Sequence, residues 1–164
     1  MSRRPLDPRR SGIVIDANAL DRDGTSRDAL IDRLLALQRR GQISITLPRG
    51  VREEALHTRT PRYVRDEIFS KIFTIPRGLT EQELQQRRRI EAVLQSNSMP
   101  GKHRADAADL FEAAKCGGGY FVTNDSRVLN KAGELAAVLP PTLKIVTLEQ
   151  LLEMFDDYES GRRV

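Results

Sequence analysis

Short apolar runs alternate with amphipathic stretches along this chain, as they do in proteins whose strands and helices alternate. Residues Ile13–Ile15 and Tyr120–Val122 are apolar throughout, with a glycine before each run and polar residues after it. Runs of this kind are typical of strands covered on both faces of a parallel sheet. Two further candidate strands are Ile43–Leu47 and Lys144–Val146. The pattern therefore predicts an α/β protein with a central parallel sheet.

Helices are expected between and after these strands. Apolar residues recur at helical spacing from residue 29 to residue 37, and Gly41 marks the end of that helix. Thr80 with Glu83, and Thr147 with Gln150, have the form of capping boxes, and they predict helices that reach about residue 95 and about residue 155. Other helices are expected at 51–56, 104–116 and 128–138. Strand, helix and strand joined by short links predict right-handed crossovers.

The length of 164 residues fits one domain with a substantial core. We place this domain at residues 12–156, after a flexible basic arm at 1–11 and before a tail at 157–164. No apolar run approaches the length of a membrane span, and the opening segment lacks the apolar core of a signal peptide. With Cys116 as the single cysteine, we expect a cytoplasmic protein without membrane contact.

Two of the predicted strands are followed by an aspartate. Asp16 comes directly after the first apolar run, and Asp125 comes shortly after the run that ends at Val122. In an open parallel sheet the functional crevice lies beyond the carboxyl ends of the strands. If the two strands are neighbours, both carboxylates project into the same cleft.

Further acidic residues fall at the starts of predicted helices. Asp106 lies in the first turn of one helix, and Asp109 follows three residues later on nearly the same face as a supporting polar residue. In an earlier helix Glu54 lies beside the apolar face and Glu53 is turned away, so Glu54 is the better candidate. Carboxylates gathered within a few ångströms would repel one another, and Mg²⁺ or Mn²⁺ would resolve that conflict. Two ions about 4 Å apart would suit phosphodiester cleavage.

Each of these acids also has an ordinary structural explanation. Asp16 would serve as a turn residue, and Asp125 would cap the helix that follows it. Asp106 would complement a helix dipole, and Glu54 would be a solvated helix residue. Because both strand-end aspartates follow buried apolar runs, we favour the metal-site interpretation.

Four segments, in this order, resemble the PIN-domain family of ribonucleases, which includes the VapC-type toxins of bacterial toxin–antitoxin pairs. The resemblance extends over nearly the whole chain, and its matching segments are Ile13–Asn18, Val51–Ala55, Asp106–Ala113 and Phe121–Asp125. The resemblance implies a three-layer α/β/α fold and a Mg²⁺- or Mn²⁺-dependent endoribonuclease, commonly a homodimer. It also implies an RNA substrate and, for a toxin, a cognate antitoxin.

The resemblance assigns roles to particular residues. Asp16, Glu54, Asp106 and Asp125 match the acidic quartet of the family, and three of them, Asp16, Asp106 and Asp125, are expected to bind the metal. Asn18 and Thr123 match polar residues near the metal.

Basic residues suggest how RNA would be bound. The formal charge of +4 suits a polyanionic partner, and Arg87, Arg88, Lys102 and Arg104 are candidates for contacts with the RNA backbone. Two alternatives stay open for the arginine-rich middle segment, a solvated helix face and a surface for an antitoxin. His57 and His103 are expected to be surface residues.

Other functions were weighed against the nuclease. Many PIN-domain proteins carry a further acid just after the last aspartate, where this chain has Ser126 and Arg127, and this favours a catalytically weak domain that binds RNA or protein. A phosphohydrolase of the haloacid dehalogenase or receiver type would need a different arrangement of acids, because residue 18 is asparagine. A dinucleotide-binding domain is excluded, since no glycine-rich loop follows the first strand.

Overall fold

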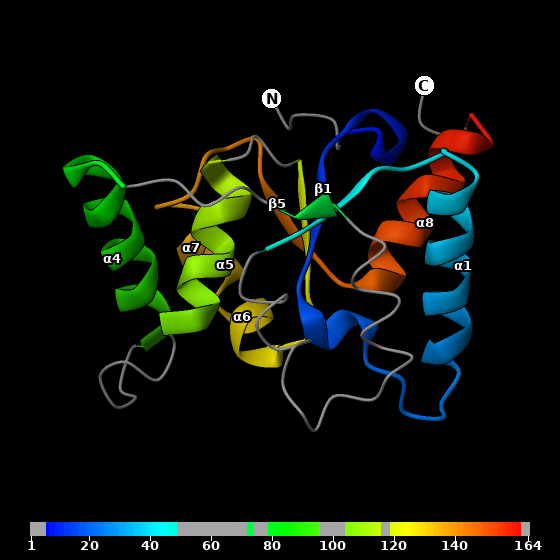
Figure 1. Ribbon diagram of the computed structural model, residues 1–164, viewed down its shortest axis with the longest axis horizontal. Coiled ribbons are helices and arrows are strands. Elements are labelled where there is room, and N and C mark those ends of the chain that lie inside the picture. Colours follow the sequence, from blue (N-terminus) through cyan, green and yellow to red (C-terminus); the bar gives the residue numbers. More distant parts are fainter. Residues whose placement is uncertain (1–5, 49–71, 74–78, 96–103, 116–118, 162–164) are drawn as a thin grey trace.

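The computed structural model describes residues 6–48, 72–73, 79–95, 104–115 and 119–161 (Figure 1). Helices and strands alternate along most of this part of the chain. The elements in chain order are η1 (Pro8–Arg10), β1 (Ile13–Ile15), η2 (Ala17–Leu20), α1 (Arg27–Arg39), β2 (Ile45–Leu47), β3 (Ile72–Phe73), α4 (Glu81–Gln95), α5 (Arg104–Lys115), β4 (Tyr120–Val122), α6 (Ser126–Asn130), α7 (Ala132–Leu135), β5 (Lys144–Val146) and α8 (Leu148–Glu159). The helix predicted at residues 51–56 lies outside the described residues.

The strands form one parallel sheet in the order β3-β2-β1-β4-β5. The first strand of the chain lies at the centre, with Ile13 opposite Ile45 on one side and opposite Tyr120 on the other. Strands β2 and β3 extend the sheet in one direction, and β4 and β5 extend it in the other. The prediction of a central parallel sheet is confirmed, and the order reverses its direction between β1 and β4.

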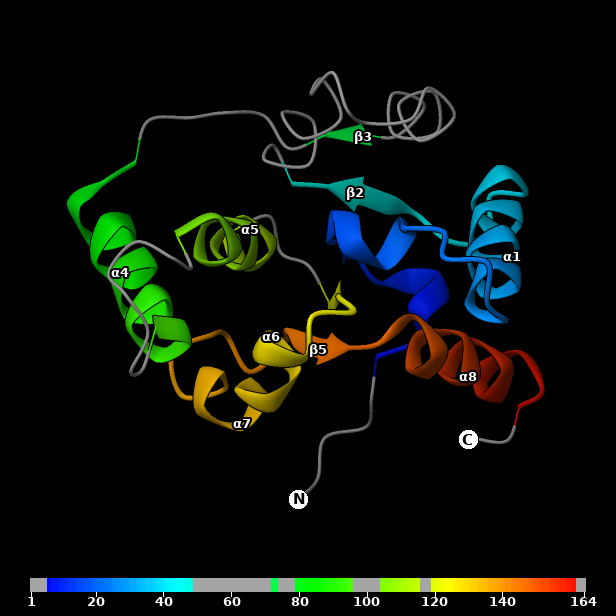
Figure 2. The same ribbon diagram turned by 90° about the horizontal axis from the view of Figure 1, so that it is seen from below.

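Both faces of the sheet are covered by helices, which gives three layers (Figure 2). Successive residues of a strand point to opposite faces, so Ile13 and Ile15 join the cluster that contains α1 and α8, whereas Val14 joins the cluster that contains α5. All three residues are at most 2% exposed. This confirms the three-layer α/β/α class and explains why the central strands are apolar at every position.

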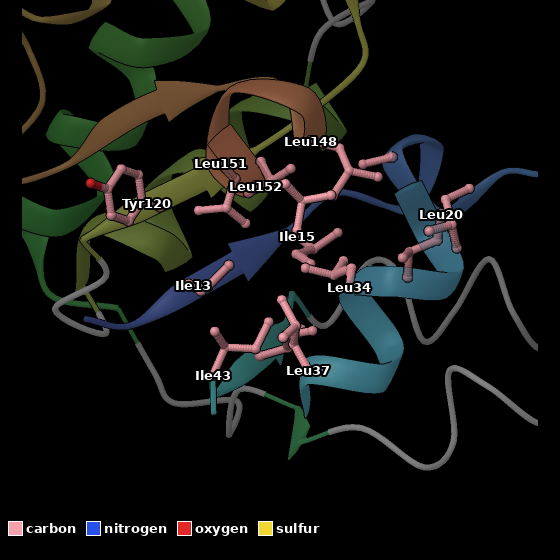
Figure 3. Packing of buried hydrophobic residues seen from close by; sticks show 14 of the residues in the cluster. Ile13, Ile15, Leu20, Leu34, Leu37, Ile43, Tyr120, Leu148, Leu151 and Leu152 are labelled. Carbon is pink, nitrogen blue, oxygen red and sulfur yellow. The ribbon is translucent and has the colours of Figure 1, made fainter. Parts of the chain in front are cut away.

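The first face is closed by α1 and α8. Figure 3 shows Ile15 among side chains from both helices, including Leu34 of α1 and Leu151 of α8. Leu34 and Leu151 are 0% and 1% exposed. Burial of side chains of this size contributes about 1.5–3 kcal/mol each, so this cluster fixes the central strand against the two helices.

The second face is closed by α5, with α4 outside it. Phe121 of β4 is in one cluster with Leu110 and Phe111 of α5. Ile90 and Leu94 of α4 and Leu135 of α7 belong to the same cluster. Helix α4 lies against α5 and α7 (Figure 1). Helix α5 therefore lies between the sheet and α4, and its first turn comes to the edge where β1 and β4 end.

The ends of three helices follow their sequence signals. Thr80 and Glu83 form the predicted capping box of α4, with bonds of 3.2 and 3.3 Å, and Thr147 and Gln150 form that of α8, with bonds of 2.9 and 3.1 Å. Helix α1 ends in a Schellman motif, because Gly41 has a φ of 71° and the backbone N–H of residue 42 donates to the carbonyl of residue 37. These predictions are confirmed.

Several predicted boundaries differ from the structure. The helix expected at 128–138 is two short helices, α6 and α7, because Lys131 leaves helical geometry (φ −98°, ψ 3°) between them. Helix α8 continues to Glu159, beyond the expected end near residue 155 and into the segment assigned to the tail. Strand β2 begins at Ile45 rather than Ile43.

Residues 6–11, which the sequence places in a flexible arm, lie against the sheet. Pro8 is buried, and the hydroxyl of Tyr120 donates to the backbone carbonyl of Leu6. Gly119 leaves room for this segment, since a β-carbon there would lie 2.8 Å from Cβ of Ser11. Part of the predicted arm is therefore packed onto the fold.

Among the helices that the structure describes, none has the length and apolar character needed to cross a bilayer.

Candidate functional site

The candidate site lies where the strand order reverses. Asp16 directly follows β1 and Thr123 directly follows β4, and these two strands are neighbours. The backbone N–H of Asp16 donates to the carbonyl of Val122 at 2.9 Å, so the two chain segments stay side by side as they leave the sheet. Ligands of open parallel sheets bind at such a reversal, beyond the carboxyl ends of the strands. The condition for both strand-end aspartates to face one cleft, that β1 and β4 are neighbours, is met.

The Thr123 hydroxyl connects the two loops. It donates to Asp16 Oδ2 at 3.1 Å and accepts a bond of 3.1 Å from the backbone N–H of Asp125. Thr123 is 0% exposed and Asp16 is 8% exposed. Because a buried carboxylate needs donors, this bond supports Asp16 at the edge of the sheet.

Asn18 makes a second connection between the loops. Its Oδ1 accepts a bond of 3.0 Å from the backbone N–H of Asn124 and lies 3.4 Å from the Thr123 hydroxyl. The N–H donor fixes which amide atom faces β4, since only the oxygen can accept. The structure therefore brings together Asp16, Asn18 and Thr123, three of the predicted site residues.

Asp16 does not use its side chain as an ordinary turn residue would. It stands at the N-cap position of η2 with no side-chain capping bond, and its backbone carbonyl accepts from Ala19 at 3.1 Å. The bond from Thr123 instead directs the carboxylate toward β4. Of the two explanations weighed for Asp16, this geometry favours a role at the site.

Asp125 does cap the helix that follows it. Its Oδ1 accepts from the backbone N–H of Arg127 at 2.9 Å, and Asp125 is the N-cap of α6. The Arg127 side chain folds back onto the same carboxylate, with Nε 3.1 Å from Oδ1 and Nη2 2.8 Å from Oδ2. The ordinary explanation for Asp125 is thus realised, and an arginine pairs with it as well.

Asp106 comes to the same place from α5. The Arg127 Nη2 that contacts Asp125 lies 4.0 Å from Asp106 Oδ2, so one guanidinium faces both carboxylates. The Arg127 pKa is raised, first by its hydrogen bond to Asp125 and also by the charge of Asp106. Asp109, one turn further along α5, is 7% exposed. Asp16, Asp106 and Asp125, which come from three segments of the chain, therefore lie at one edge of the sheet.

The chemical types of the donor atoms at this edge suit a hard cation. Carboxylate, hydroxyl and amide oxygens are the ligands that Mg²⁺ and Mn²⁺ take. Within the described residues, however, no group of three or more Asp, Glu, His or Cys side chains is close enough to form a ready-made metal site. Arg127 stands between two of the carboxylates. The described residues therefore fit the ion by the chemistry of their donor atoms, and their present spacing does not form its site.

Some predicted site residues cannot be placed. Glu54, its alternative Glu53, and Lys102 lie outside the described residues, as does the side chain of Arg104. Arg87 and Arg88 belong to α4, which lies on the far side of α5 from the sheet (Figure 2). Arg88 is exposed and Arg87 is half-buried. Their part in RNA binding stays a prediction.

Arg127 is the residue at this edge to which the sequence analysis assigned no function. A signal for it exists in the sequence, because an arginine two residues after a capping aspartate can fold back on that aspartate.

Comparisons of the chain with protein-family models, with curated proteins and with solved structures found no match.

Proposed function

We propose that this chain is a PIN-like endoribonuclease that hydrolyses RNA phosphodiester bonds with Mg²⁺ or Mn²⁺, and that it is the toxin of a type II toxin–antitoxin pair. The observation that carries the proposal is that Asp16, Asp106 and Asp125 all lie at the edge where β1 and β4 end. Thr123 links Asp16 to the backbone of Asp125, and Arg127 faces both Asp125 and Asp106. The three-layer fold and the reversal of strand order support it. The resemblance of the four sequence segments supplies the family and the biological role.

Each residue at the edge has a role in this proposal. Asp16, Asp106 and Asp125 would hold the ion, and Glu54 would complete the set. When bound, the ion supplies stabilisation for negative charge that develops on the phosphoryl oxygens. Thr123 positions Asp16 through its hydroxyl, and Asn18 holds the loops of β1 and β4 together.

The proposed substrate is single-stranded or looped RNA. The backbone of unstacked RNA can reach the edge of a sheet. In an A-form duplex the major groove is deep and narrow, and protein side chains do not enter it. The net charge of +4 favours approach of a polyanion. A cognate antitoxin, a homodimer and a cytoplasmic location complete the proposal, and they rest on the resemblance and on composition alone.

A second candidate function is a catalytically weak PIN-like domain that binds RNA or protein without cutting it. The pairing of Arg127 with Asp125 favours this alternative, because it places a permanent positive charge where the nuclease needs an ion. The two functions differ in whether RNA is cleaved.

The decisive experiment compares RNA cleavage by the native chain and by Asp16→Asn in Mg²⁺ and in Mn²⁺. We expect at least a roughly 100-fold loss of rate, because a neutral amide is a far weaker ligand than a carboxylate. The fold should persist, since an asparagine oxygen still accepts the bond from Thr123.

Glu153→Gln is the matched control, because it removes one negative charge at an exposed position of α8. Circular dichroism should show the same secondary structure in all three proteins. Equal cleavage by Asp16→Asn and the native chain would exclude the proposed site. RNA binding without cleavage by the native chain would instead select the binding module.

A further inference from the structure

One arginine occupies the space between two carboxylates of the candidate site. Arg127 makes two side-chain bonds to Asp125, of 3.1 and 2.8 Å, and the nitrogen that makes the shorter bond lies 4.0 Å from Asp106 Oδ2. A guanidinium in this paired geometry engages both oxygens of a carboxylate at once. It therefore faces the same oxygens that a bound ion would use.

The arginine is the most exposed member of this group. The Arg127 side chain is 54% exposed, against 10% for Asp125 and 23% for Asp106. Its guanidinium can therefore withdraw into water, where it stays solvated. Water and salt screen ion pairs with this degree of exposure, so the pair can open.

Withdrawal of the arginine would leave the helix cap intact. The bond that caps α6 runs from the backbone N–H of residue 127 to Asp125 Oδ1, at 2.9 Å. Any residue other than proline supplies that N–H. The side chain of Arg127 is thus separable from the local fold, and it can be changed without removing the cap.

A guanidinium and a divalent ion cannot occupy the same carboxylate oxygens together. Binding of the ion must compete with the arginine, so the apparent association constant is multiplied by the fraction of time that the arginine is withdrawn. An arginine that occupies them about nine-tenths of the time would raise the apparent Kd of the ion about tenfold.

We infer that Arg127 is an internal counter-cation that competes with the divalent ion for Asp125 and Asp106, and that the ion binds as the arginine swings out. This inference rests on the proposed function, because it takes the ion as the partner of the site. It adds a built-in limit on occupancy, so that the site fills only at ion concentrations high enough to displace the arginine.

The test measures binding of Mn²⁺ alone by isothermal titration calorimetry, in the native chain and in Arg127→Gln. We expect Arg127→Gln to bind Mn²⁺ with a Kd about tenfold lower. Arg127→Lys should fall between the two, because lysine keeps the charge and loses the paired geometry. Arg33→Gln is the control for net charge, since Arg33 pairs with Asp156 on the α1 and α8 face.

The outcomes separate this inference from the proposed function. If Mn²⁺ binding depends on Asp16 and Arg127→Gln binds no tighter than the native chain, the counter-cation role is wrong and the nuclease proposal stands. If neither the native chain nor Arg127→Gln binds Mn²⁺, both proposals are overturned. Binding by Arg127→Gln with little or none by the native chain would support the inference.

Discussion

At the scale of single residues, the edge of the sheet depends on one buried hydroxyl. Thr123 donates to a carboxylate that follows β1 and accepts from the backbone that follows β4. A hydroxyl has one proton and can accept as well, so threonine can satisfy both partners from one position. Valine has the same shape without the hydroxyl. It would remove both the bond to the Asp16 carboxylate and the bond from the backbone N–H of Asp125.

Thr123→Val should therefore lower the free energy of unfolding by about 1–3 kcal/mol, because it removes a hydrogen bond to a carboxylate and a hydrogen bond from a backbone N–H. Thr123→Ser keeps the hydroxyl and should cost less. Urea denaturation followed by circular dichroism measures both changes. A valine variant as stable as the native chain would mean that these bonds do not hold the loops together.

The sequence predicted where those candidate-site residues that follow strands would lie. Asp16, Asn18 and Thr123 come together because the strands carry them to one edge, and alternation of apolar runs with helices is visible in the sequence. The pairing of Arg127 was not predicted, because it depends on how a flexible side chain turns after the backbone is placed. Asp125 caps α6, and no pattern of residue types separates a capping aspartate from one with the proposed metal-binding role.

At the scale of elements, α1 and α8 are joined by an ion pair as well as by their apolar faces. Arg33 Nη1 lies 3.0 Å from Asp156 Oδ2, and a second bond joins Nη2 to Oδ1. The Asp156 pKa is lowered from its ordinary value of 3.8, chiefly because Arg33 donates to the carboxylate. Both side chains are largely exposed, so solvent screens the pair.

Asp156→Asn should make the protein less stable by at most about 1 kcal/mol at neutral pH. A carboxylate with a lowered pKa in the folded state contributes stability above the pKa of 3.8 that it has when unfolded. That contribution is lost as the pH falls through the folded pKa. The difference between native and variant chains should therefore shrink below about pH 4.

Denaturation at a series of pH values checks this prediction, and added salt should also reduce the difference. Glu153→Gln, an exposed change in the same helix, serves as its control. A difference that grows in acid would show that the pair does not act as described.

Element boundaries followed the sequence where local bonds set them. Thr80 and Thr147 begin α4 and α8 through bonds to residues three positions later, and those bonds are visible as short motifs. The break at Lys131 between α6 and α7 has no comparable motif. Val128 and Leu135 both enter the core, but their spacing of seven residues would also suit one unbroken helix, so the apolar pattern does not reveal the break.

At the scale of the whole molecule, the segment before β1 closes over the start of β4. A β-carbon on Gly119 would lie 2.8 Å from Cβ of Ser11 and 3.0 Å from Cδ1 of Leu6. Tyr120 bonds to a carbonyl 114 residues away in sequence. The basic composition of residues 1–11 predicted a free arm, because contacts between such distant positions leave no local pattern.

Gly119→Ala should lower the free energy of unfolding by about 1–3 kcal/mol through overpacking. In a Ser11→Gly background the same change should cost less, because the nearest atom is gone. Gly133→Ala is the contrasting control: its β-carbon meets nothing within 4 Å, and alanine should stabilise α7 by up to about 1 kcal/mol. Equal effects of Gly119→Ala in both backgrounds would rule out the predicted contact.

The bond between Thr123 and Asp16 spans 107 positions of the chain, and this has a consequence during synthesis. A nascent polypeptide released from the ribosome before residue 123 carries the first carboxylate and lacks the hydroxyl that supports it. Prematurely terminated products, or fragments left by a protease that cuts between these positions, would hold only half of the edge. Whatever this protein does at that edge, it can begin only after the first 125 of its 164 residues have been made.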